Sequence, residues 1–257
     1  MKLSGLLSAL RALPEYQSAV HALTQRPRPN LALNLPRAAR LPVIAALAED
    51  WTLGGAIAAP VLVLAARAER AATLVEELNA WVLHQTVLPF SEPNPLFYEL
   101  SLWGPRTIRA RISVLQALVA GGGKPTPVIV ASARALMTRT LPKQEFIAET
   151  HTLKVGDTVH LEQLLDNWVG IGYTSETTVI EAGQFARRGG IVDIYPLADD
   201  LPTRIELFGD EIETLRHFEP ATQRSGEAAA SVTITPAREA LPKFREKERY
   251  AGRREDL

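Results

Sequence analysis

The chain has 257 residues, of which 46% are hydrophobic, and a formal net charge of −1 at neutral pH. This length allows one large core or two modest ones, and the balanced charge provides no overall field that would steer the chain to nucleic acid. The sequence has no cysteine, which excludes disulfides and thiolate metal sites, and its five histidines lack metal-ligand spacing. No apolar run approaches the ~20 residues of a membrane span, so we expect a cytoplasmic protein without a membrane partner.

The first half of the chain alternates predicted helices with short apolar runs. Apolar residues at helical spacing predict helices at 38–49, 71–82 and 108–119. The first of these accommodates Pro42 only if it starts near Leu41. Strands are predicted at 31–35, 60–64 and 128–130, the last two typical of parallel strands covered on both faces. The Pro-rich, aromatic stretch 88–103 is interpreted as a loop. The alternation predicts a parallel α/β domain up to about residue 140.

The second half is richer in β-strand patterns. A short helix is predicted at 161–168, and strand alternation from Phe185 to Tyr195 is interrupted by Gly189-Gly190, as at a bulge or a close backbone approach. A second hairpin is predicted from 204–208 and 211–218, with Gly209-Asp210 suited to a type II′ turn. Two hairpin-like units therefore follow the α/β region, with a boundary near residue 141.

This block also resembles a known family. It contains G-Q-F-A-R-R-G-G-I-V-D-I-Y-P from Gly183 to Pro196, R-I-E-L-F-G-D-E-I from Arg204, and T-Q-R-S ending at Ser225. That order is similar to the UvrA-binding domain shared by the excision-repair protein UvrB and the transcription-repair coupling factors (Mfd). The T-Q-R-S ending and the residues upstream favour the coupling factors, specifically their N-terminal, UvrB-homologous module.

The resemblance implies a RecA-like parallel-sheet domain without a functional P-loop, into which an α+β UvrA-binding domain is inserted. In this sequence the α/β domain would span 1–140, the inserted domain 141–225, and the return to the α/β domain 226–257. UvrB-like members carry a phosphate-binding loop after their first strand. The corresponding residues include Asn34, Ala39, Arg40 and Leu41, with no glycine, lysine or magnesium-binding hydroxyl among residues 34–41. We therefore expect a non-functional nucleotide loop and no cofactor for this chain.

Two other stretches imitate nucleotide motifs. Gly121 to Lys124 follows a predicted helix and runs into Pro125, so a helix C-terminal stop explains it better than a phosphate loop. Asp210-Glu211 could imitate the acidic pair of an ATPase, but Gly209 favours a turn. No nucleophile motif is found, so no catalytic residue is expected.

Binding remains as the expected activity. Strand alternation places Phe185 and Arg187 on one face and Arg188 on the other. Arginine beside an aromatic is typical of interface anchors, although both arginines could merely pair with Glu181, Glu206 or Glu213. The resemblance favours binding, because Arg188 matches the arginine of the family's F-x-x-R-G motif. Arg188, Arg187 and Phe185 are therefore the predicted UvrA-binding residues. Thr174 departs from the arginine of many coupling factors, while Phe185, Tyr195 and Phe208 are each expected to be core or half-buried.

Three functions are compatible with these patterns. The preferred one is a non-catalytic module that recruits UvrA to stalled RNA polymerase for nucleotide excision repair. The resemblance implies a full-length protein that binds RNA polymerase and DNA and uses ATP and magnesium as a translocase. The alternatives are a UvrB-like, nucleotide-dependent damage-verification subunit and an α/β scaffold that merely inherited the sheet.

Overall fold

The computed structural model describes residues 3–25, 30–53, 59–93, 103–120 and 126–239. Its contacts divide the chain into two compact units, one of residues 1–93 and 120–138 and the other of residues 94–119 and 139–257. Each unit has its own sheet and its own apolar core. Within the described residues, no helix combines the length and apolar character needed to cross a membrane.

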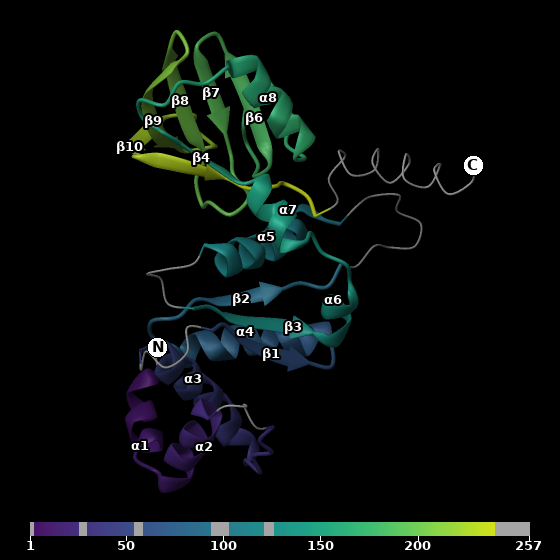
Figure 1. The fold of residues 1–257 in the computed structure, drawn as a ribbon, viewed down its shortest axis with the longest axis vertical. Coiled ribbons are helices and arrows are strands. Elements are labelled where there is room, and N and C mark those ends of the chain that lie inside the picture. The colour runs from purple at the N-terminus through teal and green to yellow at the C-terminus, as the bar shows by residue number, and fades with distance from the viewer. Residues whose placement is uncertain (1–2, 26–29, 54–58, 94–102, 121–125, 240–257) are drawn as a thin grey trace, which may run out of the picture. The chain divides into compact units, whose positions relative to one another are not determined.

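The first unit is a small parallel α/β structure (Figure 1). Its helices are the 3₁₀ turn η1 (Ser4–Leu6), α1 (Leu7–Arg11), α2 (Pro14–Thr24), α3 (Arg37–Leu53), α4 (Ala68–Trp81) and α6 (Ala133–Met137). Its strands β1 (Val61–Ala65), β2 (Val87–Phe90) and β3 (Val128–Ser132) form a parallel sheet in the order β1-β3-β2. Helix α4 turns Ala71, Leu74 and Leu78 into the core beside the central strand β3, which is entirely buried.

Most elements predicted for this unit are confirmed, but four details are wrong. Residues 31–36 form no strand, and α3 begins at Arg37, which places Pro42 inside the helix. Strand β2 lies in the stretch interpreted as a loop; Pro89 is tolerated there because β2 is an edge strand. Strand β1, predicted to be covered on both faces, leaves Leu62 and Leu64 more than half exposed because it is the other edge.

Within its described residues, the second unit combines a mostly antiparallel six-stranded sheet and a two-stranded sheet with three helices. The helices are α5 (Pro105–Val119), α7 (Lys143–Ala148) and α8 (Leu161–Gly170). The strands are β4 (His151–Lys154), β5 (Thr174–Ser175), β6 (Gln184–Arg188), β7 (Ile191–Ile194), β8 (Thr203–Phe208), β9 (Glu211–Phe218), β10 (Ser225–Ala228) and β11 (Ser231–Ile234). Six of them form one sheet in the order β10-β9-β8-β7-β6-β5, in which only the β5–β6 pair is parallel, and β11 pairs with β4.

The hairpin predicted from 204–208 and 211–218 is confirmed. Gly189-Gly190, predicted as a bulge or a close approach within one strand, is instead the turn between the separate strands β6 and β7, at the same end of the sheet. Gly189 and Gly209 each have φ +64°, a conformation that favours glycine at the first central position of a type II′ turn. The predicted close approach is also present, because a Cβ on Gly190 would lie 3.1 Å from the carbonyl oxygen of Leu207. The Leu207 N–H donates to the Gly190 carbonyl at 2.9 Å, which joins the hairpins.

The contacts place two segments differently from the sequence-based division. Helix α5, predicted within the α/β domain, contributes Ile112 to the core of the second unit. Residues 226–239, predicted to return to the α/β domain, also belong to the second unit because β11 pairs with β4. Arg111 of α5, which is fully buried, forms an ion pair with Glu239 at 2.5 Å. A long-range partner of this kind leaves no local trace in the sequence.

Candidate partner-binding face

The strands β6 to β9 present two chemically different faces. One face, here called the core face, packs beneath α8, whose Leu164, Leu165 and Trp168 meet it. Its residues are Phe185, Val192, Ile194, Ile205, Ile212 and Leu215. The opposite face, here called the outer face, carries Arg188, Ile191, Asp193, Arg204, Glu206 and Thr214, as the strand register requires. Polar chemistry is therefore concentrated on one side of the sheet.

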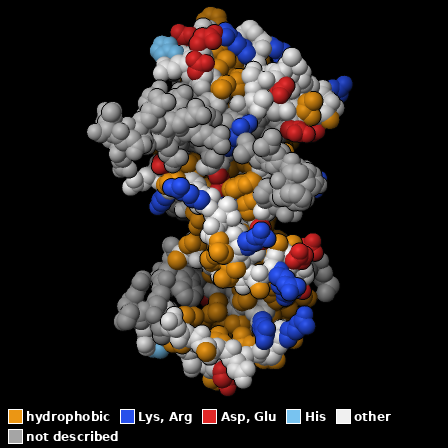
Figure 2. All heavy atoms as spheres, turned by 90° about the vertical axis from the view of Figure 1, so that its right-hand side faces the viewer, with side chains coloured by type: hydrophobic (Ala, Val, Ile, Leu, Met, Phe, Trp, Pro, Cys, Tyr) orange, Lys and Arg blue, Asp and Glu red, His pale blue; other side chains and the backbone are white. Residues whose placement is uncertain are grey.

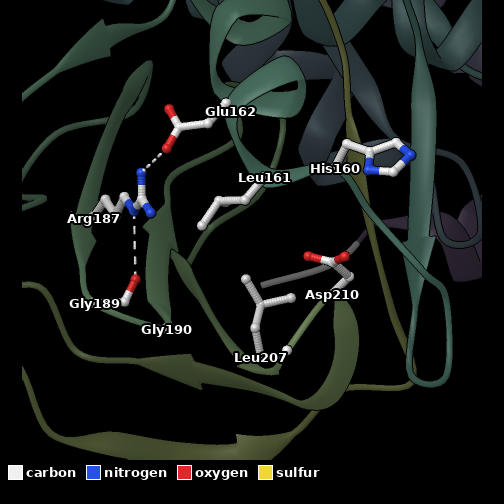
Figure 3. Close-up of a pocket in the computed structure, with 9 residues that line it drawn as sticks. His160, Leu161, Glu162, Arg187, Gly189, Gly190, Leu207 and Asp210 are labelled. Atoms are coloured by element: carbon white, nitrogen blue, oxygen red, sulfur yellow. Dashed lines mark hydrogen bonds and ion pairs between the residues drawn. The ribbon is translucent and has the colours of Figure 1, made fainter.

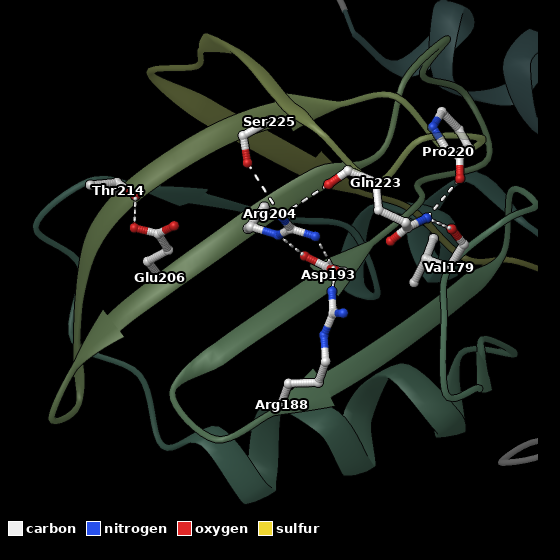
Figure 4. Close-up of polar contacts among 9 residues, drawn as sticks. All are labelled: Val179, Arg188, Asp193, Arg204, Glu206, Thr214, Pro220, Gln223 and Ser225. Atoms are coloured by element: carbon white, nitrogen blue, oxygen red, sulfur yellow. Dashed lines mark hydrogen bonds and ion pairs between the residues drawn. The ribbon is translucent and has the colours of Figure 1, made fainter.

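A buried carboxylate organises the outer face (Figure 4). Asp193 of β7 is 1% exposed and lies directly across from Arg204 of β8. Arg204 donates to its two oxygens, from Nε at 2.7 Å and from Nη2 at 2.9 Å. Arg188 of β6 donates from Nη2 to Oδ2 of the same carboxylate at 2.5 Å. Charge-assisted bonds of this kind are short and strong, so Asp193 fixes two arginines on neighbouring strands.

Arg204 is held more firmly than Arg188. Its Nη1 donates to the Gln223 carbonyl and to Ser225 Oγ, both at 3.3 Å, and its guanidinium stacks 4.8 Å from the ring of Phe218. The hydrogen bond to Asp193 raises the pKa of Arg204 above its ordinary value, partly opposed by burial. Arg188, by contrast, keeps 48% of its side chain exposed. It therefore combines a fixed position with free access from solvent.

The two ends of the outer face differ. At one end, loop residues cover the sheet: Val179 packs with Ala186, Tyr195 and Phe218. Gln223 holds that loop by donating from Nε2 to the Val179 carbonyl at 3.0 Å. At the end with the two hairpin turns lie Arg188, Ile191, Glu206 and Phe208, of which Glu206 accepts a bond from Thr214 Oγ1 at 3.0 Å. The end with the turns is the more open one.

The structure separates the three residues predicted to bind UvrA. Arg188 lies on the outer face, whereas Arg187 lies on the other side and pairs with Glu162 of α8. Phe185 is 3% exposed and packs edge-on against Trp168, with the rings 5.6 Å apart. This corrects its inclusion among the surface contacts and confirms its expected place in the core.

Other expectations for this face need correction. The two arginines pair with Glu162 and Asp193, not with Glu181, Glu206 or Glu213. Tyr195 is buried as expected, but Phe208 is 79% exposed. Asp193 and Arg204 were not singled out from the sequence. A charged residue between the apolar Val192 and Ile194 was the available signal, because a buried carboxylate requires a paired partner.

A cavity of about 610 Å³ opens where α8 begins above the two hairpin turns (Figure 3). Leu161 and Leu207 line it, together with His160, Asp210 and the ion pair of Arg187 with Glu162. Arg187 Nε also donates to the Gly189 carbonyl at 3.4 Å. Across the described ranges, no group of three or more His, Cys, Asp or Glu residues is placed to hold a metal ion.

The residues of the expected nucleotide loop lie in the first unit. Asn34 precedes α3, and Ala39, Arg40 and Leu41 lie within its first turns, so they do not connect a strand to a helix. Arg40 and Leu41 line a cavity of about 760 Å³ with Arg37 and with residues of β1 and α4. Figure 2 shows Lys and Arg side chains beside exposed apolar surface on this unit. Residues 121–124, interpreted as a helix stop, lie outside the described residues.

Residues 152–239, which lie within the second unit, match the family model of the UvrB interaction domain. The chain as a whole is similar to transcription-repair-coupling factors. It is 26% identical to that of Bacillus subtilis over 96% of this chain and 20% of the relative. It is 33% identical to the coupling factor of Mycobacterium tuberculosis over 87% of this chain and 18% of the relative. It is 31% identical to that of Myxococcus xanthus over 74% of this chain and 16% of the relative.

These findings confirm the resemblance to the coupling factors that the sequence predicted. The chain spans a fifth or less of the length of these relatives. The similarity therefore concerns one segment of these relatives. The match beginning at residue 152 and ending at 239 coincides with the strands β4 to β11 and includes the whole outer face.

Proposed function

We propose that this chain is the N-terminal, non-catalytic module of a transcription-repair coupling factor and that it recruits UvrA through the outer face. The match to the UvrB interaction domain supports a role in excision repair. The observation that carries the proposal is the network of Arg188, Asp193 and Arg204 on one side of the sheet. Recruitment would bring UvrA to RNA polymerase stalled at a lesion.

The geometry suits binding better than catalysis. Asp193 is buried and engaged by two arginines, so it is not available as a base or a nucleophile. The guanidinium of Arg188 has five N–H donors, and an N–H of Nη2 bonds to Asp193. Because the side chain is about half exposed, its other N–H groups can donate to a carboxylate or carbonyl of a partner. A pre-positioned arginine loses little conformational entropy on binding, which is what an interface anchor requires.

The proposal extends to the longer protein that the relatives imply. That protein would bind RNA polymerase and DNA, hydrolyse ATP with magnesium as a translocase, and work in the cytoplasm. Within it, the first unit would be a RecA-like domain whose nucleotide loop around Asn34, Ala39, Arg40 and Leu41 has lost its function. The chain itself would need no cofactor.

A UvrB-like, nucleotide-dependent subunit is the second candidate. The cavity beside Arg37 and Arg40, at the end of β1, is the observation that favours it. Residues 34–41 lack the glycines, lysine and hydroxyl that hold phosphates and magnesium, which favours the first proposal. Isothermal calorimetry with ATP and magnesium separates the two: we expect no binding heat, and micromolar binding abolished by Arg40→Ala would favour the second candidate.

The test of recruitment compares two adjacent arginines on opposite sides of the sheet. Binding of UvrA from the same organism is measured for the whole chain and for the Arg188→Glu and Arg187→Glu variants, with circular dichroism as a folding control. We expect Arg188→Glu to weaken binding by about 2 kcal/mol or more, as at a charged hot spot, and Arg187→Glu to bind as the parent chain does. Absence of UvrA binding by the parent chain would refute recruitment and favour an inherited scaffold.

A further inference from the structure

Phe208 stands out among the aromatic residues of the second unit. The last residue of β8, it is 79% exposed, although the sequence predicted a core or half-buried position. Single exposed apolar residues are common on protein surfaces and need no explanation by themselves. Phe208 is not isolated, however, because Ile191 of the adjacent strand β7 is also exposed.

The strand register places both side chains on the outer face. Ile191 lies across from Glu206, and Phe208 is two residues further along β8, which makes it a diagonal neighbour of Ile191. Leu207, which lies between Glu206 and Phe208 in β8, packs against the core opposite Ile212. Phe208 therefore points to the other side of the sheet. Ile191 also lies directly across from Arg188. One apolar pair and one anchored arginine therefore share the open end of this face.

The two hairpins are joined at this end of the sheet. Leu207 donates its N–H to the Gly190 carbonyl, and a Cβ at Gly190 would crowd the Leu207 carbonyl at 3.1 Å. The Gly209 turn fixes the direction in which β8 ends, immediately after Phe208. A rigid aromatic side chain binds with a small entropy cost, and aromatic residues beside arginine are typical of binding hot spots.

We propose that Phe208, supported by Ile191, is an apolar anchor that inserts into a recess of the same protein that Arg188 contacts. The identity of that protein as UvrA rests on the proposed function above; its surface would combine an apolar recess with an acceptor for Arg188. Nucleic acid fits less well, because Glu206, Asp210 and Glu211 surround Phe208 in the sequence and would repel phosphates. A protein partner is the occupant that the local charges favour.

The experiment measures UvrA binding to the whole chain with Phe208→Ala, Phe208→Leu and a control, Met137→Ala. Met137 of the first unit is 85% exposed, so the control removes a comparably exposed apolar side chain away from the outer face. We expect Phe208→Ala to weaken binding at least tenfold, Phe208→Leu to weaken it less, and Met137→Ala to leave it unchanged. Leucine keeps apolar bulk, so this variant remains informative if alanine perturbs the turn.

Each outcome distinguishes the anchor from the recruitment on which it rests. If Arg188→Glu weakens binding but Phe208→Ala does not, the anchor is refuted and recruitment stands. If the parent chain does not bind UvrA, both are refuted. Ultracentrifugation without a partner provides a further check: self-association that Phe208→Ala abolishes would assign the anchor to a second copy of this chain and overturn the proposal. Equal weakening by Met137→Ala would also overturn it.

Discussion

The core face and the outer face of strands β6 to β9 alternate residue by residue, yet their chemistry differs. On the core face, Phe185, Ile194 and Ile205 are nearly inaccessible and pack beneath α8. On the outer face, the same strands hold Arg188, Asp193 and Arg204 in one network. Because neighbouring residues point to opposite sides, stability and binding can be changed separately. Asp193 connects the two properties, since its buried carboxylate holds the exposed Arg188.

The largest expected effect is on the core face. Trp168 is fully buried and packs against Phe185 and Tyr173. We expect Trp168→Ala to lower the free energy of unfolding by about 3–5 kcal/mol, through lost burial and a remaining cavity. Urea denaturation measures this change, and UvrA binding should disappear only as the second unit unfolds. A stability loss below about 1 kcal/mol would contradict the assigned core.

Asp193→Asn should affect both stability and binding, which makes it the sharpest test of the comparison. The substitution keeps the shape but removes the charge that Arg188 and Arg204 share. We expect a stability loss of about 1.5–3 kcal/mol, the range for hydrogen bonds to charged groups, and weaker UvrA binding in the folded variant. The control is Asp200→Asn, because the Asp200 side chain is fully exposed. Unchanged UvrA binding by Asp193→Asn would show that Arg188 does not need its ion pair with Asp193 in order to bind.

A smaller effect depends on pH. Trp168 donates from Nε1 to His151 Nε2 at 3.0 Å, and burial holds the pKa of His151 below its ordinary value of 6.5. The imidazole of His151 therefore binds a proton more readily in the unfolded chain than in the folded chain. The free energy of unfolding consequently falls as the pH is lowered from 7.5 to 5.5. His151→Gln should reduce this slope and cost about 1 kcal/mol at pH 7.5. An unchanged slope would remove His151 from this role.

The smallest effect is expected for Arg187. Its ion pair joins two exposed side chains, and such pairs contribute at most about 1 kcal/mol. Arg187→Ala should therefore lower the free energy of unfolding by less than this amount, and the loss should shrink further in 1 M salt because exposed pairs are screened. Thermal melts at two salt concentrations measure it. A large, salt-independent loss would indicate that the cavity beside α8 contributes to the fold.

Local patterns in the sequence were sufficient for the main elements. Apolar spacing predicted α4, α5 and α8, and Gly209 predicted the β8–β9 hairpin, because these signals arise within a few residues. The pair Gly189-Gly190 marked an interruption correctly, but the pattern did not distinguish a bulge from the turn that is present. The motifs from Gly183 to Ser225 were sufficient for the resemblance. The same local reasoning failed at β2, where Pro89 obscured a strand whose edge position depends on its neighbours.

Only the tertiary structure decided which residues meet across the sheet. Asp193 and Arg204 are eleven residues apart, and Arg111 and Glu239 are 128 residues apart; no local pattern encodes either pair. Exposure was also decided by position. Phe185 and Phe208 belong to strands of the same sheet, but Phe185 lies beneath α8, whereas Phe208 lies next to a turn on the opposite face. Side-chain type and spacing determine local conformation, whereas strand register and packing between distant segments determine burial and therefore the surface available to a partner.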